Sequence, residues 1–206
     1  MDNIYLDTSI FEANNFLESK RINEILKLAE EGEIQIVLPV ITYYETRNRA
    51  IKNIKEANNR FKKYRDETRT LRNIASLKDR FEPLDEETCI KEFLEEFEAR
   101  LSAANCVFLE YPLVNIGSVF EKYFGEDYPF GGGNKKHEFP DAFALLTIEA
   151  WCAKEKVKCF VFSNDKDLLN YKSNLLVIVE SYEKFLDKTL IGKFAPRISC
   201  FILVYW

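Results

Sequence analysis

The chain has 206 residues, 47% of them hydrophobic and 31% charged, which suits one soluble domain with a substantial core. Its start lacks the features of a secretory signal, and no run approaches the roughly 18 apolar residues of a membrane helix, so we expect a cytoplasmic protein without a membrane partner. Its five cysteines are widely spaced and include no CxxC pair, which argues against a disulfide framework or a zinc site.

The net charge of −5 is distributed unevenly along the chain. The segment 47–80 contains twelve basic and four acidic residues and carries +8, which leaves −13 for the remainder. One interpretation of such a charge run is a helix face exposed to solvent. The other is a surface that binds a polyanion. On the second interpretation, Lys62 and Lys63 contact the backbone of a nucleic acid.

The first forty residues predict two strands with a helix between them. "NIYLDTSIF" (3–11) is a short apolar strand that ends near Asp7, and "KRINEILKLAEEGE" (20–33) has apolar residues at helical spacing before Gly32. "IQIVLPVI" (34–41) is a second apolar run rich in β-branched residues. This order indicates a right-handed βαβ unit with parallel strands.

The middle of the chain is mainly helix-forming. Residues 42–103 have one clear break, at Pro83, and "NCVFLEYP" (105–112) predicts a third strand. "GEDYPFGGGNKK" (125–136) is a loop by composition, with four glycines and a proline. We expect a single domain over 1–206 with a mainly helical insertion at about 50–135.

The last part of the chain predicts a helix and two further strands. "FPDAFALLTIEAWCAKE" (139–155) is a strong helix, followed by strands in "VKCFVFSNDKDLL" (157–169) and "NLLVIVES" (174–181). The ending "RISCFILVYW" (197–206) is apolar enough for an edge strand or for a contact between two copies of the chain, so a homodimer stays open.

Four acidic residues occupy comparable places in these elements. Asp7 ends the first strand, Glu45 lies just beyond the second, Asp141 opens a helix and Asp165 follows the fourth strand. The carboxyl ends of parallel strands share one edge of a sheet, so the four side chains can converge there. Converging carboxylates raise one another's pKa unless a cation lies between them, and hard oxygen ligands suit Mg²⁺ or Mn²⁺.

Each of the four also has an ordinary structural interpretation. Asp7 can cap a turn, Glu45 can be a surface residue, Asp141 can favour its helix dipole, and Asp165 can hold a turn with its neighbour. All four falling by chance at one edge of one sheet is improbable. We therefore expect a shared site for a divalent metal ion.

Four segments in this order, "IYLDTSIF", "ITYYE", "EFPDAFALLTIEA" and "VFSNDKDL", resemble the acidic motifs of the PIN-domain nucleases. Together they span nearly the whole chain. The chain has the segment "KKHEFPDAF" together with a long helical insertion. In this combination it resembles the larger PIN-like proteins more closely than the compact VapC-type toxins. The resemblance implies a three-layer α/β/α fold with a mostly parallel central sheet, and a metal-dependent ribonuclease activity.

The resemblance also implies roles for individual residues. The matched acidic positions are catalytic and metal-binding, Glu138 and Asp167 lie beside matched positions as auxiliary ligands, and Ser163 and Thr8 are auxiliary hydroxyl residues. Bound metal ions then activate a water for attack on a phosphodiester, so no side-chain nucleophile is required. The implied catalytic and metal-binding residues are Asp7, Glu45, Asp141 and Asp165.

Three residues in the approach to Asp141 are candidate phosphate contacts. Lys135 and Lys136 can hold a backbone phosphate, with simple solvation as an equal alternative. His137, the single histidine, is a structural residue or a phosphate contact more than a general base.

Two other functions compete with the nuclease. A haloacid-dehalogenase-like phosphatase also begins with a strand ending in aspartate, but it needs a second aspartate two positions on, where this chain has Ser9. A PIN-like module can instead bind RNA or protein without cutting, or act as a toxin held by an antitoxin-like protein. The presence of all four acidic residues favours a catalyst over a pure binding module.

Overall fold

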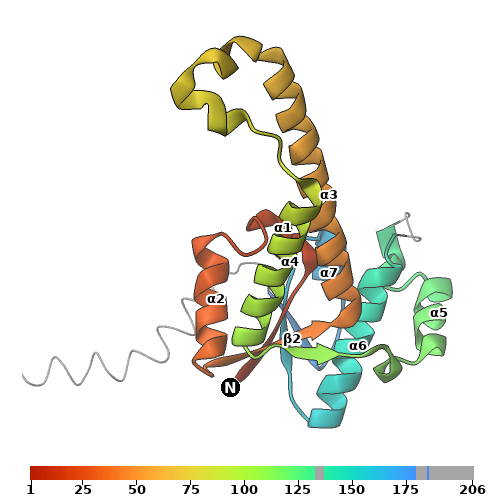
Figure 1. The fold of residues 1–206 in the computed structure, drawn as a ribbon. Helices are drawn as coiled ribbons and strands as arrows, with labels where there is room; N and C mark the ends of the chain where they lie inside the picture. Colours follow the sequence, from red (N-terminus) through yellow and green to blue (C-terminus); the bar gives the residue numbers. More distant parts are fainter. Residues whose placement is uncertain (133–136, 180–184, 186–206) are drawn as a thin grey trace, which may run out of the picture.

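The computed structural model describes residues 1–132, 137–179 and 185. In this part of the chain, five strands form one sheet in which every neighbouring pair is parallel (Figure 1). Their order across the sheet is β3-β2-β1-β4-β5, with β1 in the centre. The strands are β1 (Asp2–Leu6), β2 (Ile34–Pro39), β3 (Val107–Leu109), β4 (Cys159–Phe162) and β5 (Leu176–Val179).

Helices connect the strands and cover both faces of the sheet (Figure 1). Short 3₁₀ segments of the described ranges lie between them: η1 (Arg69–Asn73), η2 (Ala75–Phe81), η3 (Tyr111–Leu113) and η4 (Phe130–Gly132). The α-helices of the described residues are α1 (Thr8–Ala13), α2 (Lys20–Glu30), α3 (Val40–Glu67), α4 (Glu86–Ala103), α5 (Ile116–Gly125), α6 (Phe139–Glu155) and α7 (Lys166–Leu169).

Alternate residues of the central strands supply two separate cores. Ile4 and Ile36 point to one face of the sheet, where they pack with residues of α1, α2 and α4 such as Phe97. Tyr5 and Val37 point to the other face and pack with residues of α6, including Leu145. This alternation is the two-residue period of a strand buried on both faces. The expected three-layer α/β/α fold is confirmed, and its sheet is entirely parallel.

Proline decides where the second strand ends. The apolar run continues to residue 41, but β2 ends at Pro39 and α3 begins at Val40. Pro39 lies at the cap position of α3 with a φ of −56°, which suits the entry into a helix. The described residues contain no helix long and apolar enough to cross a membrane, and the segment 197–206 lies outside the described ranges.

The helical insertion forms a projection from the domain. α3 runs without interruption past α1 and continues beyond the rest of the molecule, and the chain returns through η1 and η2 to α4 (Figure 1). Asn58 of α3 donates a hydrogen bond to Glu86 of α4 (3.2 Å), and we call the residues beyond this bond, 59–85, the arm. Near its end the rings of Tyr64 and Phe81 stack with their centroids 6.0 Å apart.

Candidate metal-binding cleft

A cleft of about 570 Å³ opens beside the carboxyl end of β1. The structure brings all four predicted acidic residues to this one cleft, although they come from four different parts of the chain. Its lining residues are Asp7, Thr8, Ser9, Glu45, Arg49, His137, Glu138, Asp141, Asn164 and Asp165.

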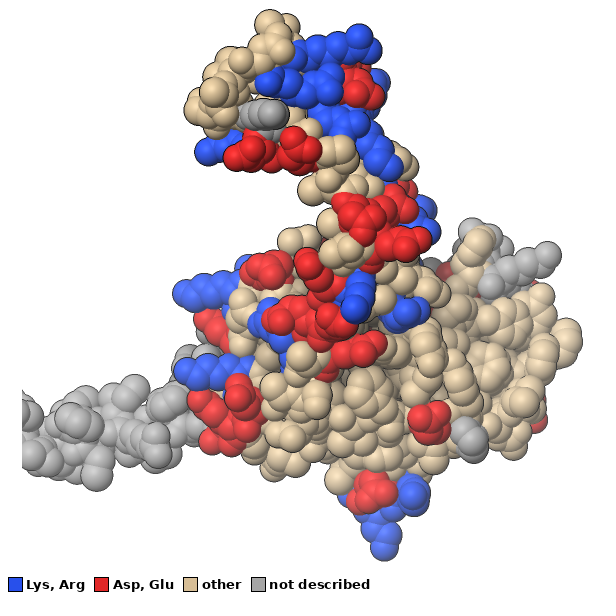
Figure 2. Space-filling view, viewed as in Figure 1, with Lys and Arg blue, Asp and Glu red and all other residues tan. Residues whose placement is uncertain are grey.

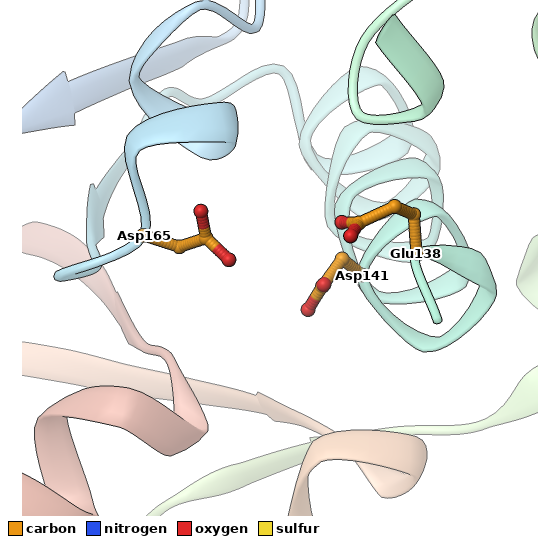
Figure 3. Close-up of side chains that lie close together, drawn as sticks. All are labelled: Glu138, Asp141 and Asp165. Carbon is orange, nitrogen blue, oxygen red and sulfur yellow. The ribbon is translucent and has the colours of Figure 1, made fainter. Parts of the chain in front are cut away.

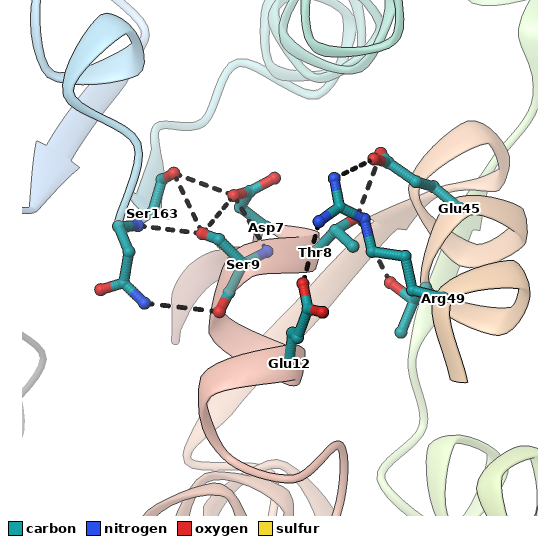
Figure 4. Close-up of polar contacts among 9 residues, drawn as sticks. Asp7, Thr8, Ser9, Glu12, Glu45, Arg49 and Ser163 are labelled. Atoms are coloured by element: carbon teal, nitrogen blue, oxygen red, sulfur yellow. Dashed lines mark hydrogen bonds and ion pairs between the residues drawn. The ribbon is translucent and has the colours of Figure 1, made fainter. Parts of the chain in front are cut away.

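Asp7 is fixed by three hydrogen bonds to a single carboxylate oxygen. The backbone NH and the hydroxyl of Ser9 donate to its Oδ2 at 3.2 and 2.5 Å, and the hydroxyl of Ser163 donates to the same atom at 2.9 Å. Asp7 is only 5% exposed and is the N-cap residue of α1, so the turn from strand to helix sets its position. Figure 4 shows its other oxygen pointing away from these donors.

Glu138, Asp141 and Asp165 form the tightest group of carboxylates in the cleft. One oxygen from each lies within 4.8 Å of the others, and Figure 3 shows the three side chains converging from two segments. Glu138 and Asp141 are three residues apart at the start of α6, which places them on one side of the helix. Asp165 comes from the turn after β4, where its backbone NH donates to the Ser163 hydroxyl at 2.9 Å.

The electrostatic environment of Asp141 is unfavourable for its charged form. Burial, followed by the negative charges of Asp7, Glu45, Glu138 and Asp165, raises the pKa of Asp141 to about 8. A divalent cation among these groups would remove this penalty. Because the donors are carboxylate oxygens, without sulfur, the residues fit Mg²⁺ or Mn²⁺ better than a soft metal.

Arg49 is a positively charged side chain at the edge of this acidic cleft. Its guanidinium donates to Glu45 Oε1 and to Glu12 Oε2, both at 2.9 Å, while the Thr8 hydroxyl donates to Glu45 Oε2 at 3.2 Å (Figure 4). Glu45 is thus held by groups on both of its oxygens. It lines the cleft without belonging to the three-carboxylate group of α6 and the β4–α7 turn.

The predicted phosphate contacts have different positions. His137 is exposed and lines the cleft. Lys62 and Lys63 lie on the distal part of α3, in the arm, and are not among the lining residues. Lys135 and Lys136 lie outside the described residues, and the side chain of Asp167 is likewise not described.

Three residues of the cleft were not predicted as site residues from the sequence. Arg49 follows Glu45 by four residues, which is the spacing at which side chains on a helix meet. The contact between Arg49 and Glu45 could therefore have been predicted from the sequence. Ser9 and Asn164 form a link between the two strand ends: the Asn164 backbone NH donates to the Ser9 hydroxyl at 3.0 Å. That link joins residues far apart in the chain and has no local sequence signal.

Ser163 connects two of the acidic residues, and its removal is expected to disturb both. Ser163→Ala removes the bond to Asp7 Oδ2 and the acceptor for the Asp165 NH. We expect a loss of about 1 kcal/mol in unfolding free energy and a roughly tenfold weaker affinity for Mn²⁺. Urea unfolding and calorimetric Mn²⁺ titration measure the two effects. Ser102→Ala, at an exposed position of α4, is the matched control and should change neither.

Comparison with known proteins gives one finding. A family model described as PIN domain matches residues 4–168, a range that includes every lining residue of the cleft. Comparisons with curated proteins and with solved structures gave no match.

Proposed function

The chain belongs to the PIN domain family, and on this basis we propose that it is a nuclease dependent on Mg²⁺ or Mn²⁺ that hydrolyses phosphodiester bonds in RNA. The PIN domain is a nuclease-type fold, which supports a hydrolase acting on nucleic acids. The observation that carries the proposal is the convergence of five carboxylates, from residues 7, 45, 138, 141 and 165, on one cleft.

The cleft residues have distinct tasks under this proposal. Asp7, Glu138, Asp141 and Asp165 would hold the metal, and Ser9 and Ser163 keep Asp7 in one orientation. A bound Mg²⁺ or Mn²⁺ supplies Lewis acidity toward water and toward the phosphate oxygens.

The remaining residues would act on the substrate or on the ligands. Glu45, held by Arg49 and Thr8, is a fifth carboxylate at the edge of the site and a candidate to orient the attacking water. Arg49 and His137 line the same cleft and are candidates to contact the phosphate.

A cleavage assay with controlled metal content tests the proposal. Purified protein treated with EDTA is incubated with end-labelled RNA and with DNA of the same sequence, and Mg²⁺ or Mn²⁺ is then added back. We expect cleavage of RNA only after metal is restored. Cleavage that persists in EDTA would contradict a metal-dependent mechanism. If Mn²⁺ raises the melting temperature and neither nucleic acid is cut, the chain is a binding module.

A further inference from the structure

The helix that carries Glu45 into the cleft continues into the arm with charged residues on the same face. Positions 49, 52, 56, 60 and 63 follow Glu45 at intervals of three or four residues, which is the spacing of one helix face. Lys63 comes eighteen residues after Glu45, or about five turns at 3.6 residues per turn, and so lies about 27 Å farther along the axis.

Burial supports this assignment of the face. Ala50 and Asn58 are buried and lie about 140° from Glu45 around the axis of α3, and Asn58 faces Glu86 of α4. The side chains of Lys52 and Lys63 are 77% and 78% exposed. Figure 2 shows Lys and Arg side chains gathered toward the far end of the arm, while the body in this view is mainly tan with red and blue side chains mixed.

The basic residues of this face are Arg49, Lys52, Arg60 and Lys63, and we call them the basic track. Two glutamates share the face and pair with the track four residues apart: Lys52 with Glu56 at 3.9 Å and Lys63 with Glu67 at 3.8 Å. Exposed ion pairs of this kind contribute little free energy, so a phosphate can take their place.

Lys62 points elsewhere. It is rotated by about 100° from Lys63 around the helix axis, and it shares its side of α3 with Lys55, seven residues earlier. Both lysines are exposed. The two lysines predicted together from the sequence therefore point in directions about 100° apart, and only Lys63 lies on the face that leads from the cleft.

We propose that the basic track binds the sugar-phosphate backbone of a nucleic acid strand that also occupies the cleft. This inference rests on the proposed function, because it assumes that a nucleic acid occupies the cleft. It adds the requirement that the strand be long enough to reach from the cleft to the arm. At 3.4 Å per stacked nucleotide, the distance from Glu45 to Lys63 corresponds to about eight nucleotides. The chain should therefore bind long strands through the arm and short ones through the cleft alone.

Two charge-reversal pairs on the same helix test this arrangement. Arg60→Glu with Lys63→Glu alters the track, and Lys55→Glu with Lys62→Glu makes the same charge change on the other side of α3. Both pairs are introduced into the Asp141→Asn background, which keeps the substrate uncut. Fluorescence anisotropy then gives the affinity for a labelled RNA of twenty nucleotides and for one of four, at several salt concentrations. Circular dichroism checks that all variants are folded.

We expect the track pair to weaken binding of the long RNA by about tenfold or more, and to reduce the slope of log affinity against log salt by about 1.4, which is two phosphate contacts. The side pair should stay within threefold, and the short RNA should respond to neither pair. Equal losses in the two pairs, no loss in the track pair, or no binding of the long RNA by the background protein would each overturn the inference. Because binding is measured, a chain that binds through the track but never cuts RNA loses only the proposed nuclease activity.

Discussion

Replacing Asp141 with asparagine is expected to lower the rate of RNA cleavage by at least about a thousandfold, which corresponds to roughly 4 kcal/mol of lost transition-state stabilisation. Burial and the negative charges of the other four carboxylates of the cleft all raise the pKa of Asp141, so this side chain lies within the electrostatic reach of the whole acidic cluster. Asparagine keeps the shape of the side chain and removes its negative charge, so metal binding should weaken with little change in packing. Single-turnover cleavage gives the rate.

The same variant should lose most of the increase in melting temperature that Mn²⁺ causes in the parent chain, since that increase reports binding to the folded state. Glu155→Gln, which removes a carboxylate at the other end of α6, is the control and should keep both the activity and the response to Mn²⁺. An Asp141→Asn protein that cuts RNA at the parental rate would show that the cluster is not catalytic.

The elements around the cleft were predictable because their signals are local. The helix 139–155 has the same bounds in the structure as in the sequence, since Pro140 suits its first turn and its apolar residues recur at helical spacing. The strand ends near Asp7 and Ser163 followed from short apolar runs. Once those strands are parallel, their shared edge brings the acidic residues together without further information.

The finer arrangement of the site depends on contacts that the sequence does not specify. Glu138 was predicted as an auxiliary ligand, yet it belongs to the tightest group with Asp141 and Asp165. Glu45 was predicted as an equal member, yet Arg49 and Thr8 hold it at the edge. Side-chain rotamers and hydrogen bonds between distant segments decide which carboxylate oxygens converge. Neither of these produces a recurring pattern in the sequence from which it could be predicted.

The arm shows the same limit at a larger scale. The helix-forming residues of the insertion predicted that it is mainly helical. The length of α3 and its projection past the domain depend instead on tertiary packing, such as the contact between Asn58 and Glu86. The position of Lys63, and not Lys62, on the face of Glu45 follows only when α3 is known to be continuous from the cleft, because a break in the helix would change the face of every later residue.

Metal-free protein is expected to lose stability as the pH rises from about 4 toward 8. The pKa of Asp141 is raised from an ordinary value of 3.8 to about 8 in the folded chain, first by burial and then by its acidic neighbours. Between these two values the folded state holds a proton that the unfolded state has released, so raising the pH favours unfolding. One such group can contribute at most about 1.4 kcal/mol for each pH unit.

Asparagine at position 141 removes this proton and should flatten the dependence, leaving the variant more stable than the parent chain at pH 8 in EDTA. Mn²⁺ should have the opposite effect on the parent, since a cation favours the ionised carboxylates and binds more tightly as the pH rises. Urea unfolding at four pH values between 5 and 8, with EDTA or with Mn²⁺, measures both dependences. Parallel curves for the parent and Asp141→Asn in EDTA would show that Asp141 is already ionised at pH 5, and that the acidic cleft tolerates its charges without a metal ion.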